Sequence, residues 1–263
     1  MVLPLYDDNT GRRLFPYVNY ALIAINVLVF VFLQRLGPEI GGKEGERFTY
    51  AFACVPYEIV TGKDVRETVA IEDPLTKRQL GTINLPPTPI SVYLTLLTSM
   101  FLHGGILHLL GNMLFLWIFG DNVEDDLGHV RYVFFYLVCG VLASLAHVAS
   151  TYAFQGNPYI PSLGASGAIS GVLGGYLLLH PHRRVMVILF RMLTEVPAYV
   201  AIGIWFLFQL LSGITELGGK VGGVAYGAHI GGFIAGLALV KVFALGRETT
   251  TWNRRAPTAR TWY

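Results

Sequence analysis

Ser166 lies where an uncharged loop, residues 154–162, gives way to an apolar helical run, residues 168–179. At the start of a helix the backbone N–H groups have no partner within the helix, and the helix dipole favours negative charge. A serine at such a position is most often a helix cap. It can also be a nucleophile, because those N–H groups would stabilise the oxyanion that its attack creates. The stretch around Ser166 is compatible with both interpretations.

Further polar side chains lie within apolar segments, where a buried polar group is costly. His103, His108 and Asn112 fall in one such segment, and His147 and His229 fall in two others. His108 and Asn112 are four residues apart and share a helix face. A lone histidine in a membrane most often hydrogen-bonds to a neighbouring helix, and this is the interpretation we keep for His147.

Small residues follow Ser166 and surround His229 at helical spacing. The first stripe comprises Gly167, Gly171 and Gly175, and the second set comprises Gly227, Gly231, Gly232 and Gly236. Such stripes allow helix backbones to approach closely. We therefore expect the two helices to pack together, with the Ser166 hydroxyl within hydrogen-bonding reach of the His229 imidazole. A serine beside a neutral imidazole is a nucleophile beside its base.

A catalytic triad would also need a carboxylate that orients the histidine. None lies in the apolar segments that carry Ser166 and the histidines, while Glu195 and Glu216 only flank another segment. The sequence thus predicts a Ser–His dyad without an acid. The candidate donors to an oxyanion are the backbone N–H of Ser166 and the side chains of His108 and Asn112.

The composition predicts a membrane protein. Hydrophobic residues make up 53% of the chain and charged residues 14%, and the mean hydropathy is +0.53. A soluble domain is usually about 25% charged. The net charge of +2 is too small to suggest nucleic acid, so the expected partner is the lipid bilayer. Cys54 and Cys139 have neither metal-ligand spacing nor a disulfide framework, and we expect no metal and no cofactor.

Six apolar segments predict an all-α integral membrane protein built as a six-helix bundle. They cover residues 18–36, 94–120, 132–152, 166–179, 196–212 and 224–245. The fourth is short for a hydrocarbon core of about 30 Å. The loop before it should therefore dip into the protein, where irregular backbone must be buried or line a water-filled cavity.

The remaining residues divide into termini and loops. Residues 1–17 form an N-terminal segment, 37–93 a long first loop, 94–245 the core and 246–263 a basic tail. Weak alternation on both sides of Asp73 and Pro74 is compatible with a hairpin in the first loop. Shorter loops are expected at 121–126, which is acidic, at 180–191, which is basic, and at 213–223, which is glycine-rich.

The charges of these loops indicate an orientation. An even number of spans places both termini on one side, and that side would carry most of the arginines. The positive-inside rule therefore predicts cytoplasmic termini in the cell (inner or plasma) membrane, and an extracytoplasmic first loop. Ser166 would then start its helix from the outer side.

Four short motifs, in this order, resemble the rhomboid intramembrane serine proteases. They are residues 103–112 (HGGILHLLGN), 119–125 (FGDNVED), 164–167 (GASG) and 228–232 (AHIGG). The resemblance covers roughly residues 98–245 and implies a six-helix core with a water-accessible site open to the outer side. It also implies a nucleophile at Ser166 and a general base at His229.

The resemblance extends to supporting residues. It implies that His108 and Asn112 help to form the oxyanion hole, with His103, Gly164 and Gly167 as supporting residues near the site. It also implies that Gly232 and Gly236 pack the sixth helix on Gly171 of the fourth. Two features depart from the pattern of relatives: Leu94 and Thr95 stand where many carry a Trp-Arg pair, and Ser170 stands where some carry an aromatic residue that stacks on the histidine.

The expected function is hydrolysis of peptide bonds in or near transmembrane segments of protein substrates. A substrate helix would approach laterally, by way of the fifth span. One alternative is a catalytically silent relative that binds client membrane proteins. Another is a transporter or channel, which would also explain a broken helix and buried polar groups.

Overall fold

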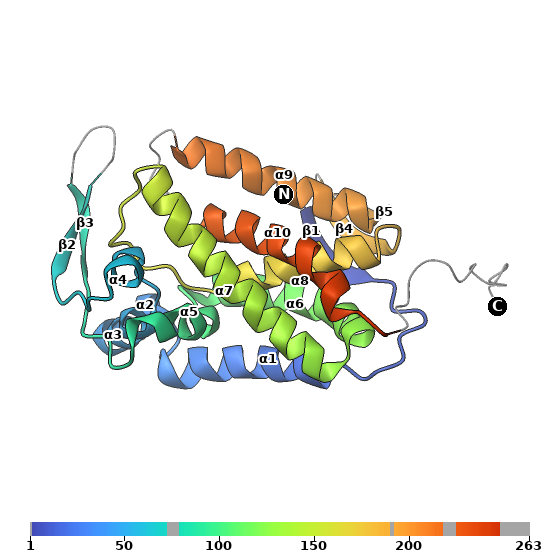
Figure 1. Cartoon of the computed structure of the whole chain (residues 1–263), viewed down its shortest axis with the longest axis horizontal. Coiled ribbons are helices and arrows are strands. Elements are labelled where there is room, and N and C mark those ends of the chain that lie inside the picture. The colour runs from blue at the N-terminus through green and yellow to red at the C-terminus, as the bar shows by residue number, and fades with distance from the viewer. Residues whose placement is uncertain (1, 73–78, 190–191, 218–224, 248–263) are drawn as a thin grey trace.

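The short helix α8 (Ser166–Leu179) lies at the centre of a helical bundle (Figure 1). This computed structural model describes residues 2–72, 79–189, 192–217 and 225–247. The long helices around α8 are α1 (Tyr17–Leu28), α6 (Ile106–Leu127), α7 (His129–Ala153), α9 (Ala198–Leu217) and α10 (Tyr226–Phe243). Nearly every side chain of α8 is buried, because α6, α7, α9 and α10 all contact it.

Four helical stretches among the described residues are long and apolar enough to cross a membrane: Tyr17–Ile40, Ile106–Leu127, His129–Ala153 and Tyr226–Phe243. The apolar part of α9, Ala198–Gly213, and α8 are shorter. With a rise of about 1.5 Å per residue, α8 is roughly 21 Å long, less than the hydrocarbon thickness. The chain is therefore a multi-pass membrane protein whose central helix does not span the bilayer by its own length.

The first span changes character at its end. α1 continues into a π-helical turn, η1 (Val29–Leu33), and the chain then reverses through Arg35 and Leu36, which both have positive φ. Gln34 is fully buried and exchanges hydrogen bonds with the backbone of His103 through its amide oxygen and nitrogen, both at 2.9 Å. This contact fixes the end of the first span to the segment that precedes α6.

The first loop is a small folded unit rather than an irregular segment. It contains α2 (Gly37–Ile40), α3 (Gly42–Phe52), α4 (Pro56–Thr61) and a hairpin of strands β2 (Thr68–Glu72) and β3 (Gln79–Asn84). The hairpin expected from the alternation is thus present, although its tip, 73–78, lies outside the described residues. The buried side chains of Val55, Val65 and Leu85 form a separate core.

This unit holds the loop that leads to α8. Cys54 and Ser162 exchange two backbone hydrogen bonds of 2.9 and 2.7 Å. The N–H of Gly164 donates to the carbonyl of Ser99, at 2.9 Å, in the short turns η2 (Val92–Leu94), α5 (Thr95–Thr98) and η3 (Ser99–Phe101) before α6. The residues just before Ser166 are therefore held by backbone hydrogen bonds to the first loop, at Cys54, and to the turns before α6, at Ser99.

The prediction of an acidic loop at 121–126 is wrong, because these residues form the last turns of α6 and are buried. The N-terminal segment supplies hydrogen-bond donors to three of these carboxylates, those of Asp121, Glu124 and Asp125. The backbone N–H groups of Val18 and Asn19 donate to Glu124 at 3.0 and 2.7 Å, and this carboxylate thereby caps the start of α1. The N–H groups of Arg13 and Leu14 donate to Asp125 at 2.8 and 2.6 Å.

The prediction of a basic loop over 180–191 is also wrong. Residues from it form strand β4 (Arg184–Leu189), which pairs with β5 (Met192–Pro197) in a hairpin that leads into α9. The third strand of this antiparallel sheet is β1 (Val2–Asp7), which pairs with the other edge of β4. Because of this sheet and the β2–β3 hairpin, the fold is mostly helical but not all-α.

A polar cluster lies where β1 ends against α6 and α8. Asp7 is buried and accepts hydrogen bonds of 2.7 Å from the Tyr176 hydroxyl and from the Asn122 amide. Arg183 also reaches Asn122, and Arg12 pairs with Asp121. Burial raises the pKa of Asp7 to about 7, an effect that the Tyr176 hydrogen bond and Arg183 oppose only in part.

Two expected segments lie largely outside the described residues. These are the basic tail, from residue 248 onward, and the later part of the glycine-rich loop, 218–224. The earlier part of that loop, up to Leu217, continues α9.

Candidate active site

Ser166 is the first residue of α8, and His229 lies in the first turn of α10. Their side chains are in contact, with 2.8 Å between Ser166 Oγ and His229 Nε2. The two residues thus come from the starts of two neighbouring helices. This is the geometry in which an imidazole can take the proton of a serine hydroxyl.

Glycines allow the two helices to come this close. A Cβ added to Gly232 would overlap the carbonyl oxygen of Gly167, and one added to Gly236 would overlap that of Gly171. On the other side of α8, Gly171 faces Cys139 of α7, where a Cβ would also overlap. α8 is therefore packed between α7 and α10 almost backbone to backbone, and this packing sets the distance from Ser166 to His229.

His108, in the first turn of α6, lies beside the serine. The Gly104 N–H donates to His108 Nδ1 at 3.3 Å, so in the neutral ring Nε2 carries the proton. A Cβ built on Gly164 would lie 2.9 Å from His108 Nε2 and 3.6 Å from Ser166 Oγ. The His108 N–H donor and the serine oxygen therefore border the same small space.

Position 164 requires glycine for two reasons. Its φ is +124°, a conformation that other residues rarely adopt, and a Cβ would contact the His108 ring. A small cavity adjoins this glycine and is lined by Ser99, Ser144, Ser166 and Ala225 among others. The space is where a carbonyl group could approach the serine.

Asn112 lies one turn after His108 and is buried, and its amide nitrogen has no hydrogen-bond partner in the part of the chain that the structure describes. His103 is fully buried, and neither of its ring nitrogens has such a partner among the described residues. The His103 ring packs edge-on against His108, with 5.2 Å between ring centroids. It therefore contacts the candidate oxyanion donor rather than the serine.

Ser170, at the position of the missing aromatic residue, is buried and donates to the Ser166 carbonyl at 2.6 Å. The rings nearest to His229 are instead Trp205, with centroids 6.3 Å apart, and Tyr226, at 6.2 Å. His147, the histidine of α7, accepts hydrogen bonds at its backbone carbonyl from Ser150 and Thr151.

Sequence reasoning missed Gln209 of α9. Its Oε1 lies 2.7 Å from His229 Nδ1, on the opposite side of the ring from Ser166. The sequence did contain a signal, because Gln209 is a polar amide side chain within the largely apolar run 196–212.

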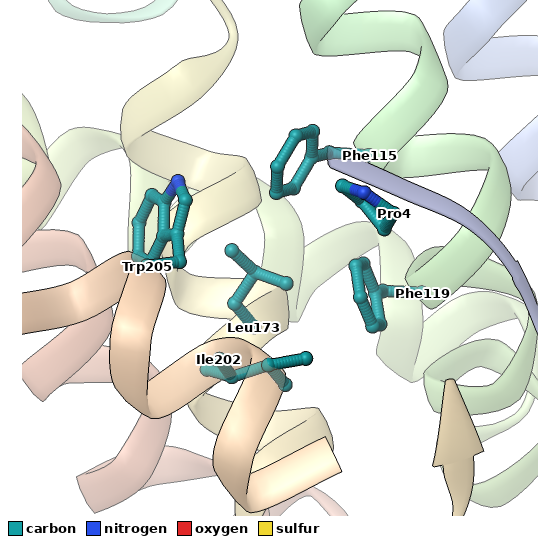
Figure 2. Close-up of a pocket in the computed structure, with 7 residues that line it drawn as sticks. Pro4, Phe115, Phe119, Leu173, Ile202 and Trp205 are labelled. Carbon is teal, nitrogen blue, oxygen red and sulfur yellow. The ribbon is translucent and has the colours of Figure 1, made fainter. Parts of the chain in front are cut away.

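A small apolar pocket lies between α9, α6 and α8 (Figure 2). Phe115 and Phe119 of α6, Leu173 of α8, Ile202 and Trp205 of α9 and Pro4 of β1 converge on it. Trp205 lies one turn before Gln209 on the same helix. The face of α9 that reaches the site therefore packs on the core mainly through apolar side chains.

The fold and the site define a multi-pass helical membrane protein with a Ser–His contact at the start of a short internal helix. The model of the rhomboid domain matches residues 91–245. Rhomboid protease GluP of Bacillus subtilis (strain 168) is 38% identical over 155 residues, which are 58% of this chain and 28% of that protein. The chain belongs to the rhomboid family.

Other relatives match at similar identity. The mitochondrial presenilin-associated rhomboid-like protein of Homo sapiens is 30% identical over 168 residues, 64% of this chain and 41% of that protein. RHOMBOID-like protein 4 of Arabidopsis thaliana is 32% identical over 230 residues, 87% of this chain and 52% of that protein. The chain thus spans less than two thirds of the length of each of these relatives.

Proposed function

We propose that this chain is an intramembrane serine endopeptidase that cuts transmembrane proteins in or near their spans. The observation that carries the proposal is the 2.8 Å contact between Ser166 Oγ and His229 Nε2 at the start of a short, buried helix. Membership of the rhomboid family and similarity to a relative named as a protease support the same reading.

In the proposed reaction, Ser166 Oγ attacks the carbonyl carbon of the scissile peptide bond and its proton passes to His229 Nε2. The negative charge develops on the carbonyl oxygen, for which His108 Nε2–H and the Asn112 amide are the proposed donors. The C–N bond then breaks as the imidazolium returns the proton to the leaving amine. Water, deprotonated by the neutral His229, hydrolyses the resulting ester and restores the serine.

Gly164, Gly167 and His103 are proposed to support this site. Gly164 leaves room for the His108 ring, and Gly167 lets α7 approach, because a Cβ there would overlap Ala143. His103 packs on the edge of His108 and would hold that ring in place.

We also propose that α9, and α8 together with the loop before it, complete two further spans beside the four longer helices, which would give six spans and place both termini on one side. The arginines of that side favour a cytoplasmic location for it under the positive-inside rule. Substrates would then enter from the bilayer, by way of α9, and meet water from the outer side.

Cleavage of a single-span reporter by the purified protein in liposomes tests the proposal. We expect the wild type to cut, Ser166→Ala and His229→Ala to be inactive, and Ser170→Ala to retain activity as a matched serine control on the same helix. Equal cleavage by wild type and Ser166→Ala would refute the proposal. A folded wild type that binds several reporters without cutting any would favour a silent, client-binding relative.

A further inference from the structure

His229 is held from two sides. Its Nε2 faces Ser166 Oγ of α8 at 2.8 Å, and its Nδ1 faces Gln209 Oε1 of α9 at 2.7 Å. Gln209 is half-buried and comes from α9, the helix that also carries Trp205 beside the ring. Three helices therefore meet at one imidazole ring.

An amide oxygen can only accept a hydrogen bond. With the Gln209 oxygen facing Nδ1, the neutral imidazole must carry its proton on Nδ1, and Nε2 then presents a lone pair to the serine. This is the tautomer that a general base needs in order to take the Ser166 proton. In the opposite tautomer Nε2 would donate to Oγ and could not accept its proton.

Nothing else among the described residues performs this task by a hydrogen bond. The titratable side chains that face His229, besides Ser166, are His108 from α6, His147 from α7 and Tyr226 from α10. None of them is an acid that could occupy the third position of a triad. Trp205 and Tyr226 contact the ring only through their aromatic faces or edges.

We propose that Gln209 is the positioning residue of the dyad, fixing the tautomer and the orientation of His229 in the role that a carboxylate has in a Ser–His–acid triad. This inference rests on the proposed peptidase function. Because the amide is neutral, it orients the ring without neutralising the imidazolium that forms during the reaction.

The position of Gln209 on α9 has a consequence. Ala198, Ala201 and Ile202 of α9 are buried in the core of the bundle, and this packing holds Gln209 beside His229. A shift of α9 would break the bond to His229. The base would therefore be correctly oriented only while α9 is seated against the site.

The test compares Gln209→Met and Gln209→Glu with wild type in the liposome cleavage assay, with Leu211→Ala as a control on the exposed side of α9. Methionine keeps the length of glutamine but offers the Nδ1–H only a thioether sulfur, which is a weak acceptor. We expect kcat to fall by about 10- to 100-fold with little change in KM and in the melting temperature. Leu211→Ala should leave kcat unchanged.

Glutamate keeps the acceptor and adds a charge that stabilises the imidazolium. We expect Gln209→Glu to retain activity and to move the acid limb of the pH–rate profile upward by about one unit or more. Such a shift requires that residue 209 lie beside the His229 imidazole in the working enzyme, as the 2.7 Å contact has it. The Glu variant also keeps the test decisive if the Met variant fails to fold.

The outcomes are separable. If wild type cuts, Ser166→Ala does not and Gln209→Met has an unchanged kcat, the positioning role is refuted and the proposed function stands. The positioning role is refuted equally if the pH–rate profile of Gln209→Glu superimposes on that of the wild type. If wild type and Ser166→Ala cut alike, both proposals are refuted.

Discussion

Gly236 of α10 packs directly on the carbonyl of Gly171 in α8, so closely that even a methyl group at Gly236 would overlap the carbonyl oxygen. The obstacle is backbone and cannot rotate away. The register of α10 on α8, and with it the distance from Ser166 to His229, is therefore fixed by glycines on both helices rather than by the catalytic side chains.

Gly236→Ala should destabilise the protein by at least about 1–3 kcal/mol and abolish cleavage, because α10 must move away from α8. The melting temperature in detergent and the cleavage rate measure both effects. Gly203→Ala is the matched control, since a Cβ at Gly203 in α9 meets nothing within 4 Å. It should be neutral, or stabilising by about 0.5–1 kcal/mol. Equal melting temperatures for the two variants would contradict this account.

His108→Ala should lower kcat by about 100- to 1,000-fold with a smaller change in KM, because a donor to the oxyanion is removed. The kinetics of reporter cleavage measure this, and His182→Ala, an exposed histidine of the turn after α8, is the control. If the two histidine variants behave alike, His108 has no role in the reaction.

Asn112→Ala separates a catalytic role from a structural one. The Asn112 amide nitrogen has no hydrogen-bond partner among the described residues, so its removal should lower kcat without lowering the melting temperature. A drop in melting temperature at unchanged kcat would instead identify Asn112 as a helix-packing residue.

Asp7 should make stability depend on pH. An aspartate titrates near 3.8 in the unfolded chain, whereas burial raises the pKa of Asp7 to about 7 in the folded protein. Between these values the folded state retains a proton that the unfolded state has lost, so stability falls as the pH rises and levels off above about 7.

Asp7→Asn should remove that part of the pH dependence. Melting temperatures of wild type and variant at pH 4.5 and pH 8 measure the effect. The first pH lies between the unfolded-state and folded-state pKa values of Asp7, and the second lies above both. We expect wild type to lose more stability than the variant between the two conditions. Parallel losses would show that Asp7 is not the group responsible.

The central helix was predictable because its signals are local. The uncharged loop before Ser166, the glycine repeat and the apolar run define α8 over Ser166–Leu179, the range that the structure has. The spacing of Gly232 and Gly236 likewise depends only on the period of a helix.

The end of the bundle formed by the last turns of α6 and the sheet of β1, β4 and β5 was not predictable in the same way. Residues 121–126 resemble a loop because acidic groups in an apolar helix are costly, yet their partners, such as the N–H groups of Arg13 and Val18, lie more than 100 residues earlier. The pairing of β1 with β4 joins residues such as Val2 and Leu189, which no local pattern connects. Gln209 was overlooked because a single polar residue in a span is usually explained by a hydrogen bond to a neighbouring helix. Only the fold brings it to His229.

The central claim, that Ser166 is a nucleophile activated by His229, is tested most directly by covalent trapping. A fluorophosphonate forms a bond between its phosphorus and Ser166 Oγ as fluoride leaves, and intact-mass and peptide mass spectrometry locate the adduct. This account predicts one adduct on Ser166 of the wild type, none in Ser166→Ala and a greatly slowed reaction in His229→Ala. An unmodified Ser166 in a folded wild type, or labelling at the same rate in His229→Ala, would contradict it.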